Sequence, residues 1–320
     1  MIQSRIVSCG MYLPKKAVTN SDLEKIVDTS DEWIKQRTGI EQRYIADDTE
    51  PTSFMATQAA LSAMKKLNLA GTDIDAIVLA TTSPDSTFPA TAVTVQDNIG
   101  MADHGFAFDV QAVCSGFMYA LSVADNFIKA GQVKRVLVIG AERFSNLLDW
   151  DDRTTCVLFG DGAGAVILEA SEETDKGILS THLHSEGAQR GILNTSGGPG
   201  TNKQTGFVHM DGKEVFRHAV TRMSEVVNET LEANNITAED VDWLIPHQAN
   251  KRIIDGTAKK LKLPIEKVVL TVDKHGNTSA ASIPLALCTA VEDGRVKEGD
   301  LLLLEALGAG LTWGSALIRW

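Results

Sequence analysis

Two stretches decide the fold of this chain: FDVQAVCSGFMYAL at residues 108–121 and LTVDKHGNTSAASIPLAL at residues 270–287. Each begins as a short apolar strand, passes through a turn and continues as a helix of small and apolar residues. A strand, turn and helix that recur at this distance indicate that about half the chain is duplicated. A repeat of that length excludes a short-period solenoid.

The neighbouring segments repeat in the same order. They are TDIDAIVLATTSP (72–84), IKAGQVKRVLVIGAE (128–142) and GDGAGAVILEA (160–170) in the first half, and EDVDWLIPHQAN (239–250), VEDGRVKEGDLLLLEALG (291–308) and GAGLTWGSALIRW (308–320) in the second. Apolar strands without alternation, separated by helical stretches, predict an α/β fold whose sheets are covered on both faces. We expect two halves, residues 1–172 and 173–320, with the boundary in the polar stretch between Glu172 and Lys176.

Composition narrows the class of protein. The chain has 320 residues, of which 43% are hydrophobic and 22% charged, as in an ordinary globular protein. A net charge of -12 argues against a surface adapted as a whole to nucleic acid. We find no signal peptide and no apolar run near the ~20 residues of a membrane span. We therefore expect a cytoplasmic protein that binds neither nucleic acid nor membranes.

Cys114 is the candidate nucleophile. It lies where the apolar run FAFDV gives way to a helical stretch, so its sulfur should be near the amino end of a helix. Unpaired N–H groups and the helix dipole at that end favour a thiolate and lower the pKa of the thiol. We interpret Cys9, Cys156 and Cys288 as small buried hydrophobic residues. The cysteines are far apart and form no C-x-x-C pair, so we expect neither zinc nor disulfides.

Two further residues are predicted to share one crevice with Cys114. His247 follows the strand-like WLIP, and Asn277 lies in the turn of the second half that matches the Cys114 turn. Ligand and catalytic groups gather at the carboxyl ends of strands in α/β sheets. Taken singly, the asparagine suits a turn and the histidine a structural hydrogen bond. The repeat instead indicates that all three converge between the halves.

Other motifs are weaker. GDGAG at residues 160–164 is followed by the strand-like AVILEA, whereas a dinucleotide-binding fingerprint requires a helix there. His182 and His184 form an H-x-H pair with no accompanying cluster of metal ligands, so we interpret them as neighbours on one face of a strand and predict no metal site. The basic run KRIIDGTAKKLK at 251–262 stands out in an acidic chain and suits an acidic macromolecular partner.

These motifs carry a resemblance to a known family. The matching segments are VDTSDEWIKQRTGI (27–40), the Cys114 turn, DRTTCVLFGDGAGA (152–165), GKEVF (212–216), PHQANKRI (246–253), HGNTSAAS (275–282) and GAGLTWGSAL (308–317). Together they resemble the β-ketoacyl-acyl-carrier-protein synthase III family almost from end to end. The resemblance implies a homodimer of the thiolase fold, with two pseudo-duplicated halves in a layered αβαβα core. It also implies the decarboxylative condensation of an acyl-CoA, most simply acetyl-CoA, with malonyl-acyl carrier protein, which starts fatty-acid synthesis.

The resemblance assigns roles to the candidate residues. Cys114 would carry the acyl group as a thioester, and its N–H together with that of Ala309 would form the oxyanion hole. His247 and Asn277 would donate hydrogen bonds to the malonyl thioester as carbon dioxide departs. Because decarboxylation itself generates the carbanion, the site needs donors rather than a strong base. No cofactor is expected, since acyl-CoA is a substrate.

The remaining roles come from the same resemblance. The coenzyme A and pantetheine channel would be formed by Thr29, Trp33, Arg37, Arg153, Gly212, Phe216, Ala249 and Asn250, with the adenine held between Trp33 and Arg153. The carrier protein would meet Arg217, Arg252, Lys259 and Lys260. Phe88 would reach the acyl pocket of the partner subunit.

The sequence departs from the family pattern in the turn Gly308-Ala309-Gly310, where three glycines are common, and at Ser115 after the nucleophile. The methyl group of Ala309 would narrow the site if that position required unusual backbone angles. Three alternatives stay open at this point. They are an acyltransferase or secondary-metabolism condensing enzyme that takes a longer primer, a catalytically silent carrier-binding subunit, and a nucleotide-binding oxidoreductase that rests on GDGAG alone.

Overall fold

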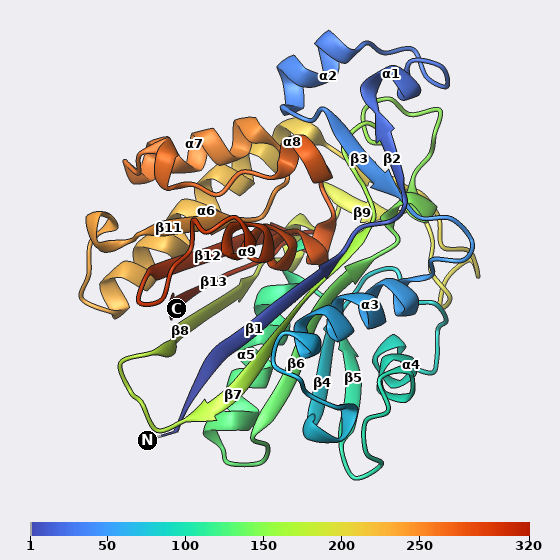
Figure 1. Cartoon of the computed structure of the whole chain (residues 1–320). Helices are drawn as coiled ribbons and strands as arrows, with labels where there is room; N and C mark the ends of the chain where they lie inside the picture. Colours follow the sequence, from blue (N-terminus) through green and yellow to red (C-terminus); the bar gives the residue numbers. More distant parts are fainter. Residues whose placement is uncertain (1) are drawn as a thin grey trace.

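The computed structural model describes residues 2–320 and is built on two β-sheets (Figure 1). The five-stranded sheet has the order β1-β7-β6-β4-β5. Its strands are β1 (Gln3–Tyr12), β4 (Ala76–Ala80), β5 (Phe106–Val110), β6 (Arg135–Glu142) and β7 (Gly162–Ser171). The four-stranded sheet has the order β11-β12-β13-β8, with β8 (Gly177–Ser185), β11 (Trp243–Pro246), β12 (Leu301–Gly308) and β13 (Thr312–Arg319).

The two sheets repeat one pattern of strand pairing. In the first sheet β1 and β6 are antiparallel to β7, and β4 is parallel to β6. In the second, β8 and β12 are antiparallel to β13, and β11 is parallel to β12. The first sheet continues with β5, parallel to β4, whereas the corresponding stretch of the second half makes a single parallel bridge between Leu244 and Val268. The pairing therefore repeats as the sequence predicted, apart from this last strand.

Helices cover both faces of each sheet. The outer face of the first sheet carries α3 (Thr52–Lys65) and α4 (Thr91–Asn98), and the outer face of the second carries α6 (Gly212–Ala233) and α7 (Lys251–Leu261). Between the sheets lie α5 (Gly116–Lys129) and α9 (Ser282–Glu292) (Figure 1). These five layers are the predicted αβαβα arrangement.

The layers explain why the strands are apolar on both faces. In β4, Ile77 and Leu79 face the core beneath α3 and α4, while Ala76, Val78 and Ala80 face the core shared with α5. This central core contains buried residues of both halves. The division between residues 172 and 173 falls in the link from β7 to β8. That the halves are separate domains stays a prediction.

Smaller elements stand at the upper end of the molecule in Figure 1. They are the antiparallel strands β2 (Lys16–Thr19) and β3 (Gln42–Ile45), with α1 (Asn20–Leu23), α2 (Asp31–Thr38) and α8 (Val272–His275); β9 (Leu193–Thr195) and β10 (Val208–Met210) form a further antiparallel pair. The fully buried Arg43 ties β3 to the body, because its guanidinium donates to Asn20 Oδ1 and to the carbonyl of Val157, both at 2.7 Å. None of the helices in residues 2–320 is both long and apolar enough to cross a membrane.

Candidate active site

A cavity of about 520 Å³ leads to a cluster of buried polar residues. Cys114, His247 and Asn277 all line it, and they are only 5%, 2% and 6% exposed. They come from the turns that follow β5 and β11 and from the turn before α9. The structure thus brings together the three residues that the repeat placed in one crevice.

Cys114 sits in the short helical turn η2 (Val113–Ser115), directly before α5. The hydroxyl of Ser115 donates to the carbonyl of Ala112 at 2.9 Å and bonds Thr312 Oγ1 at 2.8 Å, which fixes the turn to β13. Burial raises the pKa of the Cys114 thiol to about 12. This differs from the sequence expectation of a lowered pKa, because the loss of solvation outweighs the hydrogen bonds that lower the pKa of the thiol.

His247 is held by its backbone and by the residue after it. Its N–H donates to the carbonyl of Glu305 at 2.8 Å. The Gln248 side chain accepts from the N–H groups of Thr271 and Val272 at 2.8 and 3.0 Å, and it donates to the carbonyls of Pro246 and Val269 at 2.8 and 3.0 Å. Burial lowers the pKa of His247 to about 3, so the imidazole is neutral at pH 7 and keeps one N–H donor.

Asn277 lies against the first half of the chain. Its N–H donates to the carbonyl of Leu158, and its carbonyl accepts from Gly160, both at 2.9 Å. In the side chain, Oδ1 accepts the N–H of Ser279 at 2.9 Å. Because the amide oxygen is engaged in this way, the amide N–H groups remain for a ligand.

The match between the two turns is not residue for residue. The counterpart of η2 is η7 (Ser279–Ala281), which immediately precedes α9, so Cys114 corresponds to Ala280. Asn277 comes three residues earlier than that position. The sequence therefore predicted the correct turn for Asn277 but not its place within the turn.

The glycine turn at the end of β12 packs closely against the Cys114 turn. A methyl group placed on Gly308 would lie 2.8 Å from the backbone nitrogen of Cys114 and 2.8 Å from the carbonyl oxygen of Ala112. Only glycine allows this approach. Ala309 is not among the residues with positive φ and lines a second cavity beside Cys114. An alanine at this position therefore adopts ordinary backbone angles. The replacement of the family's usual glycine by Ala309 causes no backbone strain.

The second cavity, of about 130 Å³, was not found from the sequence. Its apolar wall includes Phe144, Leu147, Phe159, Leu193 and Val208. Phe144 and Phe159 stack with ring centroids 4.3 Å apart. These residues come from four separate segments of the chain, so no sequence pattern groups them. The only local indication of an apolar pocket was the aromatic residue Phe144 in ERFSNLL. Both cavities reach Cys114.

Most of the residues expected to bind coenzyme A line the larger cavity. These are Trp33, Arg37, Gly212, Phe216, Ala249 and Asn250, and Arg252, expected at the carrier protein, lines it as well. Thr29 and Arg153 are not among the lining residues.

The pair expected to hold the adenine is closed in this structure. The guanidinium carbon of Arg153 lies 5.4 Å from the centre of the Trp33 ring, while its Nη1 donates to the carbonyl of Asp28 at 2.9 Å. A ring inserted between them needs about 7 Å, twice the usual ~3.5 Å contact. Arg153 would have to move outward before it could stack on a nucleobase.

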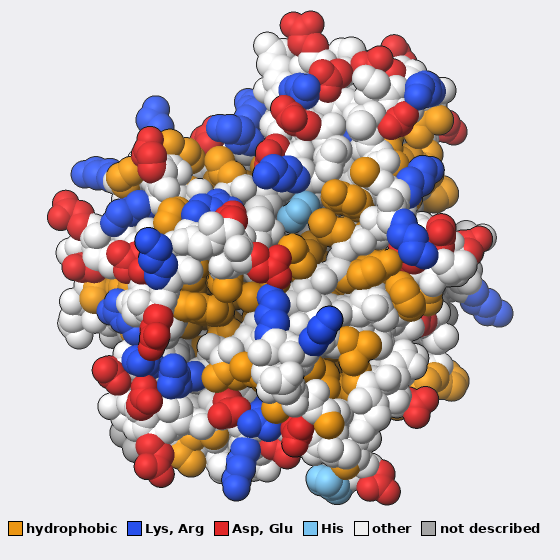
Figure 2. Space-filling view, viewed as in Figure 1, with side chains coloured by type: hydrophobic (Ala, Val, Ile, Leu, Met, Phe, Trp, Pro, Cys, Tyr) orange, Lys and Arg blue, Asp and Glu red, His pale blue; other side chains and the backbone are white. Residues whose placement is uncertain are grey.

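The remaining predicted residues lie on the surface. Lys259 and Lys260 form the exposed last turn of α7, and Figure 2 shows Lys and Arg side chains over this helix. Arg217 is exposed and pairs with Glu214 at 2.6 Å. Phe88 is 83% exposed and stands outside both cavities of this chain. Its contact with a partner subunit stays a prediction.

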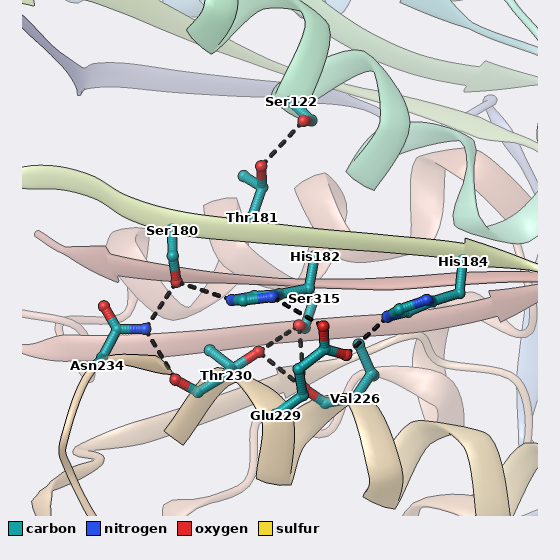
Figure 3. Close-up of polar contacts among 10 residues, drawn as sticks. All are labelled: Ser122, Ser180, Thr181, His182, His184, Val226, Glu229, Thr230, Asn234 and Ser315. Atoms are coloured by element: carbon teal, nitrogen blue, oxygen red, sulfur yellow. Dashed lines mark hydrogen bonds and ion pairs between the residues drawn. The ribbon is translucent and has the colours of Figure 1, made fainter. Parts of the chain in front are cut away.

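The H-x-H pair is accounted for by one carboxylate (Figure 3). His182 Nδ1 and His184 Nε2 lie 3.2 and 2.6 Å from the two carboxylate oxygens of Glu229 on α6. Within residues 2–320, no group of three or more His, Cys, Asp or Glu side chains is arranged to hold a metal ion. GDGAG leads into strand β7, as expected.

A duplicated α/β core in five layers, with cysteine, histidine and asparagine meeting where the halves join, defines a condensing enzyme of the thiolase fold. Comparison with known proteins agrees. Residues 108–187 match the family described as 3-oxoacyl-[acyl-carrier-protein] synthase III, and residues 231–320 match its C-terminal part.

Individual relatives cover the whole chain. The β-ketoacyl-[acyl-carrier-protein] synthase III of Paramagnetospirillum magneticum is 61% identical, over 100% of this chain and 99% of its own. The crystal structure of the Aquifex aeolicus 3-oxoacyl-[acyl-carrier-protein] synthase III matches with a TM-score of 0.94 and 51% identity, over 99% of this chain and 100% of that one. A priming β-ketosynthase of the R1128 polyketide pathway also matches, at 34% identity and a TM-score of 0.94, over 99% and 96% of the two chains.

The chain belongs to the β-ketoacyl-acyl-carrier-protein synthase III family, the condensing acyltransferases that initiate fatty-acid biosynthesis.

Proposed function

We propose that this chain condenses a short acyl-CoA with malonyl-acyl carrier protein through a thioester on Cys114. The product would be 3-ketoacyl-acyl carrier protein, with release of carbon dioxide and coenzyme A. One observation carries the assignment of residues. Cys114 lies at the meeting point of two cavities, and the larger cavity is lined by a neutral His247 and by the amide of Asn277. A thiol and two hydrogen-bond donors around one point suit acyl transfer followed by enolate stabilisation.

In the first half-reaction, Cys114 Sγ attacks the thioester carbon of the primer. We assign the oxyanion to the backbone N–H groups of Cys114 and Ala309, a choice supported by the close contact of Gly308 with the Cys114 turn. Collapse of the tetrahedral intermediate expels coenzyme A through the cavity lined by Trp33 and Phe216. The acyl chain then occupies the smaller cavity, whose wall is mainly apolar.

In the second half-reaction, malonyl thioester enters the larger cavity. Its carbonyl oxygen accepts from His247 and from the free amide N–H of Asn277 as the bond to the departing carboxylate breaks. The electron pair of that bond forms an enolate, which attacks the acyl carbon on Cys114; collapse of the resulting tetrahedral intermediate breaks the bond to Sγ and releases Cys114 as the thiolate. The imidazole serves as a neutral donor here, in keeping with its low pKa. Because decarboxylation supplies the carbanion, we propose no cofactor.

We also propose the partners expected from the family. Arg252 lines the larger cavity, Arg217 is exposed on α6, and Lys259 and Lys260 are exposed at the end of α7; these four residues would meet the acidic carrier protein. Among the described residues, β5 has a strand neighbour on one side only, and its Phe106 and Phe108 are partly exposed. An unpaired apolar edge supports dimerisation along β5, with Phe88 reaching the partner. We place this activity in the cytoplasm.

A second candidate keeps the chemistry and changes the primer. The smaller cavity, at about 130 Å³, approaches the ~150 Å³ of a protein cavity that holds benzene and so exceeds the needs of an acetyl group. The similarity to a polyketide priming enzyme points the same way. A longer primer, of secondary metabolism or of fatty-acid synthesis, is therefore the alternative.

Intact mass spectrometry tests the function directly. After brief incubation with acetyl-CoA, the wild type should gain one acetyl group and Cys114→Ala none. Adding malonyl-acyl carrier protein should then discharge the adduct and yield the 3-ketoacyl product. If only longer acyl-CoA primers form the adduct, the alternative holds. Failure of every primer would overturn the proposal.

A further inference from the structure

A buried carboxylate lies behind the nucleophile and has no part in the mechanism given above. Glu142 ends strand β6 and is fully buried. It accepts from the N–H groups of Thr82 and Ser83 at 3.1 Å, from Ser83 Oγ at 2.5 Å, from Thr81 Oγ1 at 3.3 Å and from Ser279 Oγ at 3.1 Å. Among residues 2–320, no cation forms an ion pair with it. A charge desolvated to this degree is costly to keep, which suggests a use.

Ser279 connects this carboxylate to the reacting atoms. Its hydroxyl donates to Glu142 Oε1 at 3.1 Å. When the same hydroxyl donates to the Cys114 sulfur instead, it lowers the pKa of the thiol against the effect of burial. Its N–H separately holds the amide oxygen of Asn277. Ser279 has a φ of +50°, an uncommon conformation for a residue other than glycine. Such angles persist where the surroundings enforce them, often at functional sites.

Acyl transfer requires Cys114 to lose its proton, and two buried groups are available to take it. Burial lowers the pKa of His247 to about 3, so this imidazole is a weak base inside the cavity. Burial raises the pKa of Glu142 to about 7, which leaves it partly ionised at neutral pH and in the range where a general base works best. The carboxylate also raises the pKa of the thiol by its charge, so the two groups favour sharing one proton.

We propose that the Ser279 hydroxyl relays the proton of Cys114 to Glu142 during acylation. This inference rests on the proposed function. As the Cys114 S–H bond breaks, Ser279 Oγ takes that proton and gives its own to Glu142 Oε1, while the sulfur electron pair forms the bond to the thioester carbon. The carbonyl π pair moves to oxygen. When the intermediate collapses, the C–S bond to coenzyme A breaks, and the leaving thiolate takes the proton held by Glu142 through the Ser279 hydroxyl, so that coenzyme A departs as the thiol.

The relay assigns different roles to its two members. In the relay Ser279 exchanges a proton with the reacting sulfur and is a catalytic residue, whereas Glu142 acts through Ser279 and is a positioning residue that also stores the proton. The groups that face Glu142 from the loop after β4 and from η7 are hydroxyls and backbone N–H groups. The titratable thiol of Cys114 lies beyond Ser279, and neutral His247 lines the same cavity as the thiol.

The test separates the two half-reactions. The rate of acetyl adduct formation on Cys114 is measured by quenched-flow mass spectrometry from pH 5.5 to 9, and decarboxylation of malonyl-acyl carrier protein is measured separately on enzyme that has already been fully acylated. In the wild type, acylation should rise with pH through about 7, because the carboxylate must be ionised to accept the proton. Ser279→Ala and Glu142→Gln should lower acylation by about 10²-fold and flatten this rise.

Decarboxylation should stay within about threefold of wild type in Ser279→Ala, because the backbone N–H that holds Asn277 is unchanged. Ser83→Ala is the matched control for loss of a hydroxyl. Its Oγ donates to the other carboxylate oxygen, Oε2. Because that bond lowers the pKa of Glu142, its loss should move the pH rise upward without flattening it.

Each contrary result has a separate meaning. Ser279→Ala that acylates at the wild-type rate across the range overturns the relay. An equal fall of acylation and decarboxylation in Ser279→Ala also overturns it, since a purely structural role would lower both rates together. A wild type that forms no adduct with any acyl-CoA rejects the proposed function itself, and the relay with it.

Discussion

Turns η2 and η7 occupy corresponding places in the two halves but contribute in different ways. Turn η2 presents Cys114, whereas η7 has Ala280 at that position and Asn277 three residues earlier. Each turn is supported by the other half. Gly308 of β12 lies against η2, and Gly140 of β6 lies against η7, where a methyl group would be 2.2 Å from the carbonyl oxygen of Ala280. Duplication has kept this reciprocal support and divided the chemistry between the copies.

The strand ends differ in the same way. Strand β6 ends two residues after Gly140, at Glu142, which contributes a side-chain carboxylate. Strand β12 ends at Gly308 itself, and the residues that follow, Ala309 and Gly310, contribute backbone groups. A second buried carboxyl, Glu305 of β12, has no hydrogen-bond partner for either oxygen among the described residues. The first half thus places a negative group behind the site, and the second places backbone donors there.

The largest effect should come from removing the distinctive residue of each half. Cys114→Ala should form no acyl adduct, because the nucleophile is gone. Asn277→Ala should still form the adduct but lose condensation by about 10²–10³-fold, the usual cost of one oxyanion donor. Adduct formation and product yield measured in parallel check both. An Asn277→Ala protein that cannot be acylated would show that the chemistry is not divided between the halves.

The reciprocal contacts can be broken with one methyl group each. Gly140→Ala and Gly308→Ala should both lower the free energy of unfolding, by about 1–3 kcal/mol or more, because backbone atoms must shift. Gly140→Ala should cost more, since its contact would be 2.2 Å rather than 2.8 Å. Denaturant unfolding measures the difference.

Gly187→Ala is the control for that pair, because a methyl group there meets no atom within 4 Å. It should change stability by less than about 0.5 kcal/mol. Equal losses at all three positions would contradict the reciprocal support.

The pH dependence of the free energy of unfolding distinguishes the buried carboxyl of Glu305 from that of Glu142. Burial raises the pKa of Glu305 from 4.5 to about 8, so the folded protein holds a proton there that the unfolded chain releases. Its contribution to stability is complete below pH 4.5 and is lost as the pH rises towards 8, at ~1.4 kcal/mol per pH unit. Glu305→Gln should therefore gain stability relative to wild type between pH 5 and 8. Thermal unfolding across that range would contradict this if the two curves ran parallel.

The smallest effect concerns the outer helices α4 and α7, which follow the corresponding strands β4 and β11. Helix α7 ends in Lys259 and Lys260, whereas α4 has no basic residue in its last turn. Replacing both lysines by glutamine should raise the KM for the carrier protein severalfold and leave the KM for acetyl-CoA unchanged, because exposed charges contribute only ~0.2–1 kcal/mol each. A change in both KM values would argue against a docking role.

How far the sequence predicted this molecule depends on the range of the interactions involved. Apolar strands, helix starts and the repeat are local patterns, and they placed Cys114 and His247 at strand ends. Asn277 was assigned to the right turn but not to its exact position, because the segment that precedes η7, which includes α8, has no counterpart between β5 and η2 in the first half. The closed Trp33 and Arg153 pair depends on the side-chain conformation of Arg153, which a family pattern does not describe.

Contacts across long distances in sequence were missed. The hydrogen bond from Ser279 to Glu142 joins residues 137 positions apart. Burial, which reversed the expected shift in the pKa of Cys114, is likewise a property of the whole fold. The local signals, a serine in NTSAAS and a glutamate that ends an apolar strand, were visible but had no partner until the halves were packed together.

The unequal edges of the two sheets bear on how many copies can assemble. Beside β11 the chain closes the sheet with the single bridge at Val268, whereas β5 leaves its outer edge open. Two copies that joined through β5 about a twofold axis would each use this edge completely, and no β5 edge would remain for a third. An assembly that grows through this edge therefore stops at two copies.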